Sequence, residues 1–172
     1  ARAAIFLKAS ELLKGEYRAK INASTMINQS KTCHQAEIDS ACELIDFWRF
    51  NVQYAREIYE DLQPPVSPSS MWNSSEVRPL EGFVFSVTPF NFSSIAANLP
   101  SSAAIMGNTG VWKPSRNSYL SNYYLMRLMM DAGLPDGVIN FIPGKASMIG
   151  DICLSHTMLS LIHISEPTRR TT

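Results

Sequence analysis

The alternation of strand-like and helix-like segments between residues 82 and 142 constrains the fold more than any other feature. Apolar runs at residues 82–88 (GFVFSVT), 108–113 (NTGVWK) and 137–142 (GVINFI) favour strands. Residues 93–106, which we expect Pro100 to interrupt, and residues 118–132 favour helices. In the second helix, Ser118 is the expected N-cap and Gly133 the expected stop. This order predicts an α/β fold with three parallel strands and crossover helices.

The first 62 residues favour helices instead of strands. Residues 2–14 and about 16–28 form two expected helices, and Thr32 with Gln35 forms a capping box that opens a third. Two apolar stripes along the third helix predict burial on two sides: Ile38, Ala41, Ile45, Trp48, Val52, Ala55 and Tyr59, and Leu44, Phe47, Phe50, Tyr54 and Ile58. The expected organisation is a helical segment (1–62), a Pro/Ser linker (63–70), an α/β domain (71–158) and a tail (159–172).

Composition argues against several classes of partner. The 15 Lys and Arg residues balance the 15 Asp and Glu residues, so no net field attracts nucleic acid or an anionic membrane. No apolar run reaches the length of about 20 residues that a membrane helix needs. The 3 cysteines are widely spaced, which suits a reducing compartment. No metal site is expected, because metal-ligand spacing is missing among His34, His156 and His163.

Polar residues follow the first two expected strands. Residues 88–92 (TPFNF) come after the first and residues 112–115 (WKPS) after the second. The carboxyl ends of neighbouring parallel strands meet at one rim of a sheet, where ligands gather. The candidate site residues are therefore Thr88, Asn91, Lys113 and Ser115.

Each candidate also has an ordinary structural explanation. Asn91 suits a turn, and alternatively its amide can donate to a developing oxyanion. Lys113 suits a solvated strand end, and alternatively it can donate to ribose hydroxyls or phosphate. Thr88 and Ser115 suit a turn and a cap, whereas Trp112 is expected to pack on the opposite face.

The order and spacing of three motifs indicate a family. TPFNF, then WKPS, then residues 132–144 (AGLPDGVINFIPG) together resemble the aldehyde dehydrogenase superfamily. Within it, residues 29–51, and Phe90 before Asn91, resemble the mitochondrial delta-1-pyrroline-5-carboxylate dehydrogenases. The resemblance covers residues 1 to about 157. The resemblance implies that the chain is an N-terminal, NAD-binding fragment of such an enzyme. Its expected fold is an incomplete Rossmann-like parallel sheet preceded by a helical segment.

The resemblance implies a specific reaction. Such enzymes oxidise glutamate 5-semialdehyde, the open form of pyrroline carboxylate, to glutamate in proline breakdown and reduce NAD. By this resemblance Asn91 stabilises the oxyanion, Lys113 holds the adenosine ribose, Thr88 lines the cofactor through its backbone and Ser115 lies near the adenine. A homodimeric parent protein in the mitochondrial matrix is also implied.

The sequence departs from the family towards its C-terminal end. The family's nucleophilic cysteine and general-base glutamate lie further along, so neither role falls to Cys33, Cys42 or Cys153, and the chain itself is expected to be inactive. Residues 159–172 (LSLIHISEPTRRTT) resemble a translated sequencing adapter, which predicts a non-native tail on a truncated chain. The alternative is a genuine terminal strand carrying Leu159, Leu161 and Ile164.

Two other functions remain open from the sequence. One is a catalytically silent paralogue that serves as a structural or binding subunit. The other is an aldehyde dehydrogenase with a different substrate. A nucleophilic cysteine and a general-base glutamate further along the chain would distinguish the enzyme from the silent subunit.

Overall fold

The fold is that of a computed structural model, which describes residues 1–164. The expected tail therefore lies outside the described residues from position 165 onward. The described elements, in chain order, are α1 (Arg2–Lys14), α2 (Arg18–Gln29), α3 (Cys33–Ala36), η1 (Glu37–Cys42), α4 (Glu43–Asp61), β1 (Phe83–Val87), α5 (Ser93–Ile105), β2 (Thr109–Lys113), η2 (Arg116–Ser118), α6 (Tyr119–Asp131), β3 (Ile139–Phe141), α7 (Ala146–Leu154) and β4 (Leu159–Ile164).

The helical segment follows the sequence prediction, with one local surprise. The capping box of Thr32 and Gln35 is present, with each side chain accepting the other residue's backbone N–H. The third helix then passes through the π-helical turn η1 before α4 begins. Such turns are rare and are frequent at functional sites. The periodicity of the apolar stripes gave no sign of this turn.

The prediction that the third helix is buried on two sides is wrong for most of the second stripe. Leu44 is fully buried, but Phe50, Tyr54 and Ile58 are exposed. The first stripe is buried mainly at Ala41, Ile45, Trp48 and Ala55, while its Ile38 is exposed. One face of α4 packs on α1 and α5, and the other face carries the exposed side chains.

A parallel sheet of four strands forms the centre of the α/β part. The strand order is β3-β2-β1-β4, and β1 pairs in parallel with both β2 and β4. The three expected strands are present, but the sheet has four strands and not three, because β4 joins it. Residues 159–164 thus take the strand conformation of the alternative interpretation, because their backbone groups pair with the edge of β1.

Pro100 does not interrupt α5, contrary to expectation. The helix continues from Ser93 to Ile105 with Pro100 buried inside it. Proline removes one backbone hydrogen bond, but α5 is packed between α4 and the sheet, and this tertiary packing outweighs the local preference. Trp48 of α4 strengthens the contact, since its indole Nε1 donates to the Ser101 hydroxyl at 3.0 Å.

The N-terminus of α6 is capped by a residue that the sequence did not suggest. Ser118 occupies the N-cap position but makes no capping bond, since its hydroxyl donates to the Ser115 carbonyl. Instead, the Asn28 side-chain oxygen accepts from the backbone N–H of Leu120 at 3.0 Å and of Ser121 at 3.2 Å. The distant α2 therefore supplies the cap.

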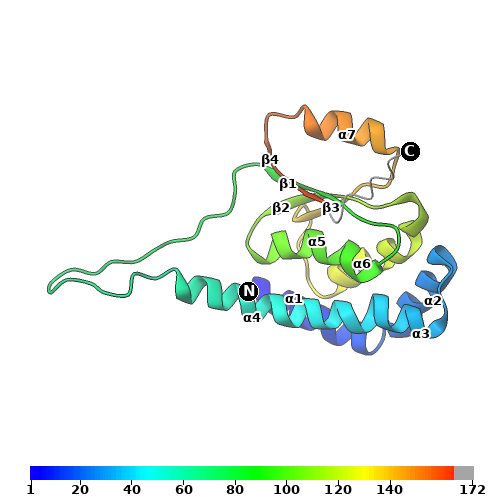
Figure 1. The fold of residues 1–172 in the computed structure, drawn as a ribbon, viewed down its shortest axis with the longest axis horizontal. Coiled ribbons are helices and arrows are strands. Elements are labelled where there is room, and N and C mark those ends of the chain that lie inside the picture. Colours follow the sequence, from blue (N-terminus) through cyan, green and yellow to red (C-terminus); the bar gives the residue numbers. More distant parts are fainter. Residues whose placement is uncertain (165–172) are drawn as a thin grey trace, which may run out of the picture.

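The elements form stacked layers (Figure 1). The helix α7 covers one face of the sheet, and α5 and α6 cover the other; α1 to α4 lie outside α5 and α6. One apolar cluster joins the helical segment to the α/β part, including Phe6, Leu13 and Trp48 with Trp112 and Leu125. Between α4 and β1, residues 62–82 form an extended arm without helix or strand.

Candidate functional site

The strand register brings two of the predicted site residues together. Val87 at the end of β1 pairs with Lys113 at the end of β2. The next residue, Thr88, donates its backbone N–H to the Lys113 carbonyl at 3.2 Å, and its hydroxyl accepts from Trp112 Nε1 at 3.0 Å. Thr88 and Lys113 are therefore neighbours at the rim, as the sequence predicted, and Trp112 is buried packing.

Lys113 is buried, which rules out the interpretation of a solvated strand-end lysine. Its relative exposure is 8%. Burial is the cause that lowers the pKa of its ammonium group from the ordinary value of 10.5, and no carboxylate contributes. The ion pairs among residues 1–164 do not involve Lys113. The rim thus holds a desolvated cation without an acidic partner among these residues.

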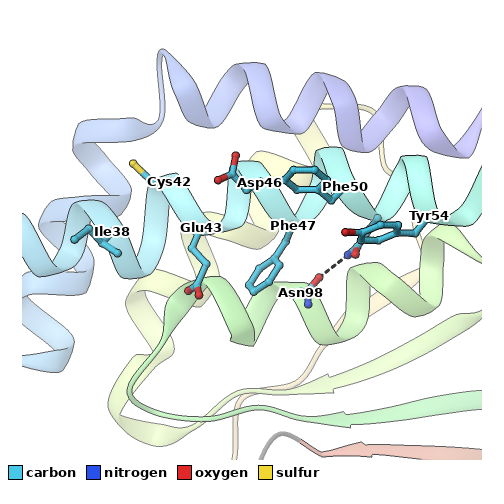
Figure 2. A pocket seen from close by; sticks show the side chains of 9 residues that line it. Ile38, Cys42, Glu43, Asp46, Phe47, Phe50, Tyr54 and Asn98 are labelled. Carbon is cyan, nitrogen blue, oxygen red and sulfur yellow. Dashed lines mark hydrogen bonds between the residues drawn. The ribbon is translucent and has the colours of Figure 1, made fainter.

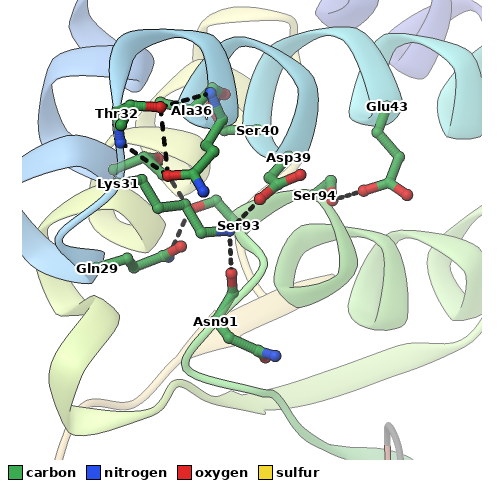
Figure 3. Close-up of polar contacts among 12 residues, drawn as sticks. Gln29, Lys31, Thr32, Ala36, Asp39, Ser40, Glu43, Asn91, Ser93 and Ser94 are labelled. Atoms are coloured by element: carbon green, nitrogen blue, oxygen red, sulfur yellow. Dashed lines mark hydrogen bonds and ion pairs between the residues drawn. The ribbon is translucent and has the colours of Figure 1, made fainter.

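Asn91 lies in the loop between β1 and α5, three positions after Thr88. The residue is exposed, and its backbone carbonyl accepts a hydrogen bond from Lys31. Its side-chain amide points away from the helical segment (Figure 3). The next residue, Phe92, is the N-cap of the 13-residue α5. The amide therefore lies beside a helix N-terminus, whose partial positive charge favours a developing anion.

Ser115 lies two residues beyond Lys113, at the start of η2. It is half-buried, and its carbonyl accepts from the backbone N–H of Ser118 at 3.1 Å. Among residues 1–164, Ser115 makes no hydrogen bond to Thr88, Asn91 or Lys113. The structure therefore gives Ser115 a role in the turn and does not join it to the other three.

Buried polar contacts fix the first turn of α5 to the helical segment (Figure 3). Ser93 accepts from Gln29 Nε2 at 2.8 Å and lies 3.0 Å from the Thr25 hydroxyl oxygen. Ser94 donates to the Glu43 carboxylate. Sequence reasoning missed these contacts, because serine at a helix start is common and its partners lie 51 to 68 positions away.

A groove between α4 and α5 is a second feature that the sequence did not predict (Figure 2). Its volume is about 510 Å³, and its lining mixes aromatic with polar side chains: Ile38, Cys42, Glu43, Asp46, Phe47, Phe50, Asn51, Tyr54 and Asn98. Asn51 Nδ2 donates to Asn98 Oδ1 at 2.7 Å across it. Because Glu43 also bonds Ser94, the groove reaches the first turn of α5 beside the Asn91 loop.

The cysteines show no sign of an activated nucleophile. Cys33 is exposed on the surface, and Cys153 lies on the buried face of α7, against Phe85. Burial raises the pKa of the Cys153 thiol, and burial followed by a hydrogen bond to Glu37 raises that of Cys42. A nucleophilic cysteine needs a lowered pKa. Neither of these two thiols has the environment of a catalytic thiolate.

The part of the chain that the structure describes lacks two further kinds of feature. Residues 1–164 contain no cluster of three or more His, Cys, Asp and Glu side chains placed to hold a metal ion. Within the same residues, each helix is too short or too polar to cross a membrane.

Comparison with known proteins identifies the family. A family model described as "Aldehyde dehydrogenase family" matches residues 1–166. The mitochondrial delta-1-pyrroline-5-carboxylate dehydrogenase of Dictyostelium discoideum is 47% identical over 168 residues, which cover 98% of this chain and 30% of that protein. The corresponding protein of Homo sapiens is 46% identical over 164 residues, covering 95% and 29%.

Solved structures agree on the fold. The crystal structure of a delta-pyrroline-5-carboxylate dehydrogenase from Mycobacterium tuberculosis bound with NAD superimposes with a TM-score of 0.91 at 54% identity. The alignment covers 94% of this chain and 30% of that one, so the chain spans roughly a third of its relatives' length. This confirms the expected α/β architecture. Because the family model matches residues 1–166, the chain belongs to the aldehyde dehydrogenase family.

Proposed function

We propose that this chain forms part of the active site of an NAD-dependent dehydrogenase that oxidises glutamate 5-semialdehyde to glutamate in proline breakdown. The observation that carries the proposal is the rim where Thr88 and Lys113 are neighbours and where Asn91 stands at the start of α5. The names of relatives that are 46 to 54% identical support the choice of substrate and of NAD.

The residues at the rim fit NAD. Lys113 is a buried ammonium group without a carboxylate partner in residues 1–164, and such a group needs acceptor atoms. Ribose hydroxyl oxygens would supply them, so we assign ribose binding to Lys113. Thr88 would line the same site through its backbone, and Ser115 would lie near the adenine. Bound NAD would supply a hydride acceptor.

Asn91 suits the stabilisation of negative charge. When a nucleophile attacks an aldehyde, the carbonyl oxygen becomes an oxyanion and needs preorganised donors. The Asn91 amide can donate two N–H groups, and the adjacent N-terminus of α5 contributes a favourable dipole. We therefore assign Asn91 to the oxyanion.

The whole protein is further proposed to be a homodimer of the mitochondrial matrix. Its relatives in Dictyostelium discoideum and Homo sapiens carry mitochondrial names. On the arm formed by residues 62–82, Val66, Met71 and Trp72 are well exposed, and a second copy could cover these apolar side chains. Sedimentation of the whole protein and fractionation of its source cells test these two statements.

The activity is tested with the purified whole protein, pyrroline carboxylate and NAD. We expect NADH formation, and we expect Asn91→Ala to lower kcat about 10²- to 10³-fold, the usual cost of removing one oxyanion donor. NAD affinity should stay nearly unchanged. Gln53→Ala, on the exposed face of α4, is the matched control and should behave like the wild type.

The 172-residue chain alone serves as the negative control, because it covers only 30% of the length of a relative such as the Dictyostelium discoideum protein. Wild-type kcat in Asn91→Ala would overturn the role of Asn91. Faster turnover of unrelated aldehydes than of the semialdehyde would overturn the choice of substrate.

A further inference from the structure

Lys31 stands in a turn whose backbone is fixed on both sides. The preceding residue, Ser30, ends α2 in the left-handed conformation with φ of 53°. The following residue, Thr32, is locked by its reciprocal hydrogen bonds with Gln35. The turn fixes the Lys31 backbone, and contacts of the ammonium group hold the side chain against the loop between β1 and α5.

The Lys31 ammonium group has three partners, and Figure 3 shows two of them, Asp39 and Asn91. It pairs with the Asp39 carboxylate of η1, it donates to the Asn91 backbone carbonyl, and it lies 4.2 Å from the centre of the Phe92 ring. The Lys31 and Asp39 side chains are only 13% and 18% exposed. An ion pair shielded to this extent is screened less by water and salt than a surface pair.

The contact falls on the residue whose orientation matters most at the rim. The Asn91 residue is exposed, so packing does not hold its side chain, and the place of the amide at the rim depends on the position of the Asn91 backbone. Lys31 holds that backbone by the carbonyl, and its contact with Phe92 holds the next residue. Displacement of a reacting or stabilising group by about 1 Å can cost about 100-fold in rate.

We propose that Lys31 is a positioning residue for Asn91, with Asp39 orienting the Lys31 ammonium group. This inference rests on the proposed role of Asn91 at the oxyanion. Neither Lys31 nor Asp39 needs to touch the substrate. The turn between α2 and α3 thus acts on the rim of the α/β part through one main-chain carbonyl.

The first turn of α5 has separate anchors, so Lys31 can be removed without detaching the helix. Ser93 is bonded to Gln29 and lies beside Thr25, and Ser94 is bonded to Glu43. These contacts do not involve Lys31. The loss of the Lys31 contact should therefore loosen Asn91 while the fold and the Lys113 end of the rim remain in place.

The experiment compares kcat with NAD affinity in the whole protein. Lys31→Met keeps the length of the side chain and removes its charge; we expect kcat to fall about 10- to 100-fold while the Kd for NAD stays within error. The Tm should fall no further than in Asp39→Asn, which breaks the same ion pair. Lys31→Arg should restore most of kcat, because a guanidinium group can donate to the same carbonyl. Lys8→Met is the matched control, since Lys8 Nζ of α1 donates to the Asp131 carbonyl at the end of α6 at 3.2 Å, away from the rim.

The double variant decides whether Lys31 acts through Asn91. In the Asn91→Ala background, Lys31→Met should cause no further loss of kcat, because the amide that it positions is gone. A full additional loss in the double variant, or wild-type kcat in Lys31→Met, would overturn the inference. A parallel loss of kcat, NAD affinity and Tm would make Lys31 structural and overturn it too. If Asn91→Ala leaves kcat unchanged, the proposed role of Asn91 at the oxyanion fails. If Asn91→Ala lowers kcat but Lys31→Met does not, the role of Asn91 stands and only the role of Lys31 fails.

Discussion

Replacement of Lys113 by methionine should separate cofactor binding from stability. Charge-assisted hydrogen bonds contribute about 1.5–3 kcal/mol, so Lys113→Met should weaken NAD binding by about 10- to 150-fold. Loss of stability is not expected, because the Lys113 side chain is 8% exposed and has no carboxylate partner in residues 1–164. Removing an isolated buried charge should instead raise the free energy of unfolding by about 0.5–2 kcal/mol in the absence of NAD.

The sign of the stability effect follows from the pKa of Lys113. Burial lowers it below 10.5, so the charged form is less favourable in the folded protein than in the unfolded one. At pH 7 the ammonium group is charged, and its burial destabilises the fold. The advantage of the methionine variant should narrow as the pH rises through the lowered pKa towards 10.5.

Calorimetric titration with NAD and urea unfolding without NAD measure the two effects in the whole protein. Lys14→Met is the control, because Lys14 is an exposed lysine of α1 and should change neither quantity. Unchanged NAD affinity in Lys113→Met, or a lower free energy of unfolding without NAD, would refute the reasoning. In either case Lys113 would not be a desolvated cation kept for a ligand.

Two further predictions concern the contacts that join the layers. Asn28→Ala should destabilise the protein by about 0.5–2 kcal/mol and speed amide exchange at Leu120 and Ser121, whereas Asn28→Asp should keep the cap; unchanged exchange at both amides would contradict this. Glu37→Gln should lower stability at pH 7 by about 0.2–1 kcal/mol, since the pair with Arg18 is partly exposed. Because the hydrogen bond from Arg18 lowers the pKa of Glu37, the difference in Tm should persist above pH 4.5 and vanish as the pH falls through the lowered pKa; a difference that is equal at pH 7 and pH 3 would contradict this.

The sequence by itself determined the elements and the position of the rim. Period-two and period-three-to-four patterns are local properties, so they located β1, β2 and β3 and most of the helices. The ends of parallel strands must meet at one edge of the sheet, and this alone placed Thr88 and Lys113 on the same rim. The capping box at Thr32 was equally local and was predicted for the same reason.

Only the tertiary structure decided what each residue contacts. Whether Lys113 is solvated or buried depends on the layers around the strand end, and the cap of α6 comes from Asn28, 92 positions before Leu120. Pro100 lies within a continuous helix because packing outweighs its local preference. The contact of Lys31 with Asn91 spans 60 positions. Such contacts leave no periodic trace in a sequence, because they arise only once the helical segment has packed against the first turn of α5.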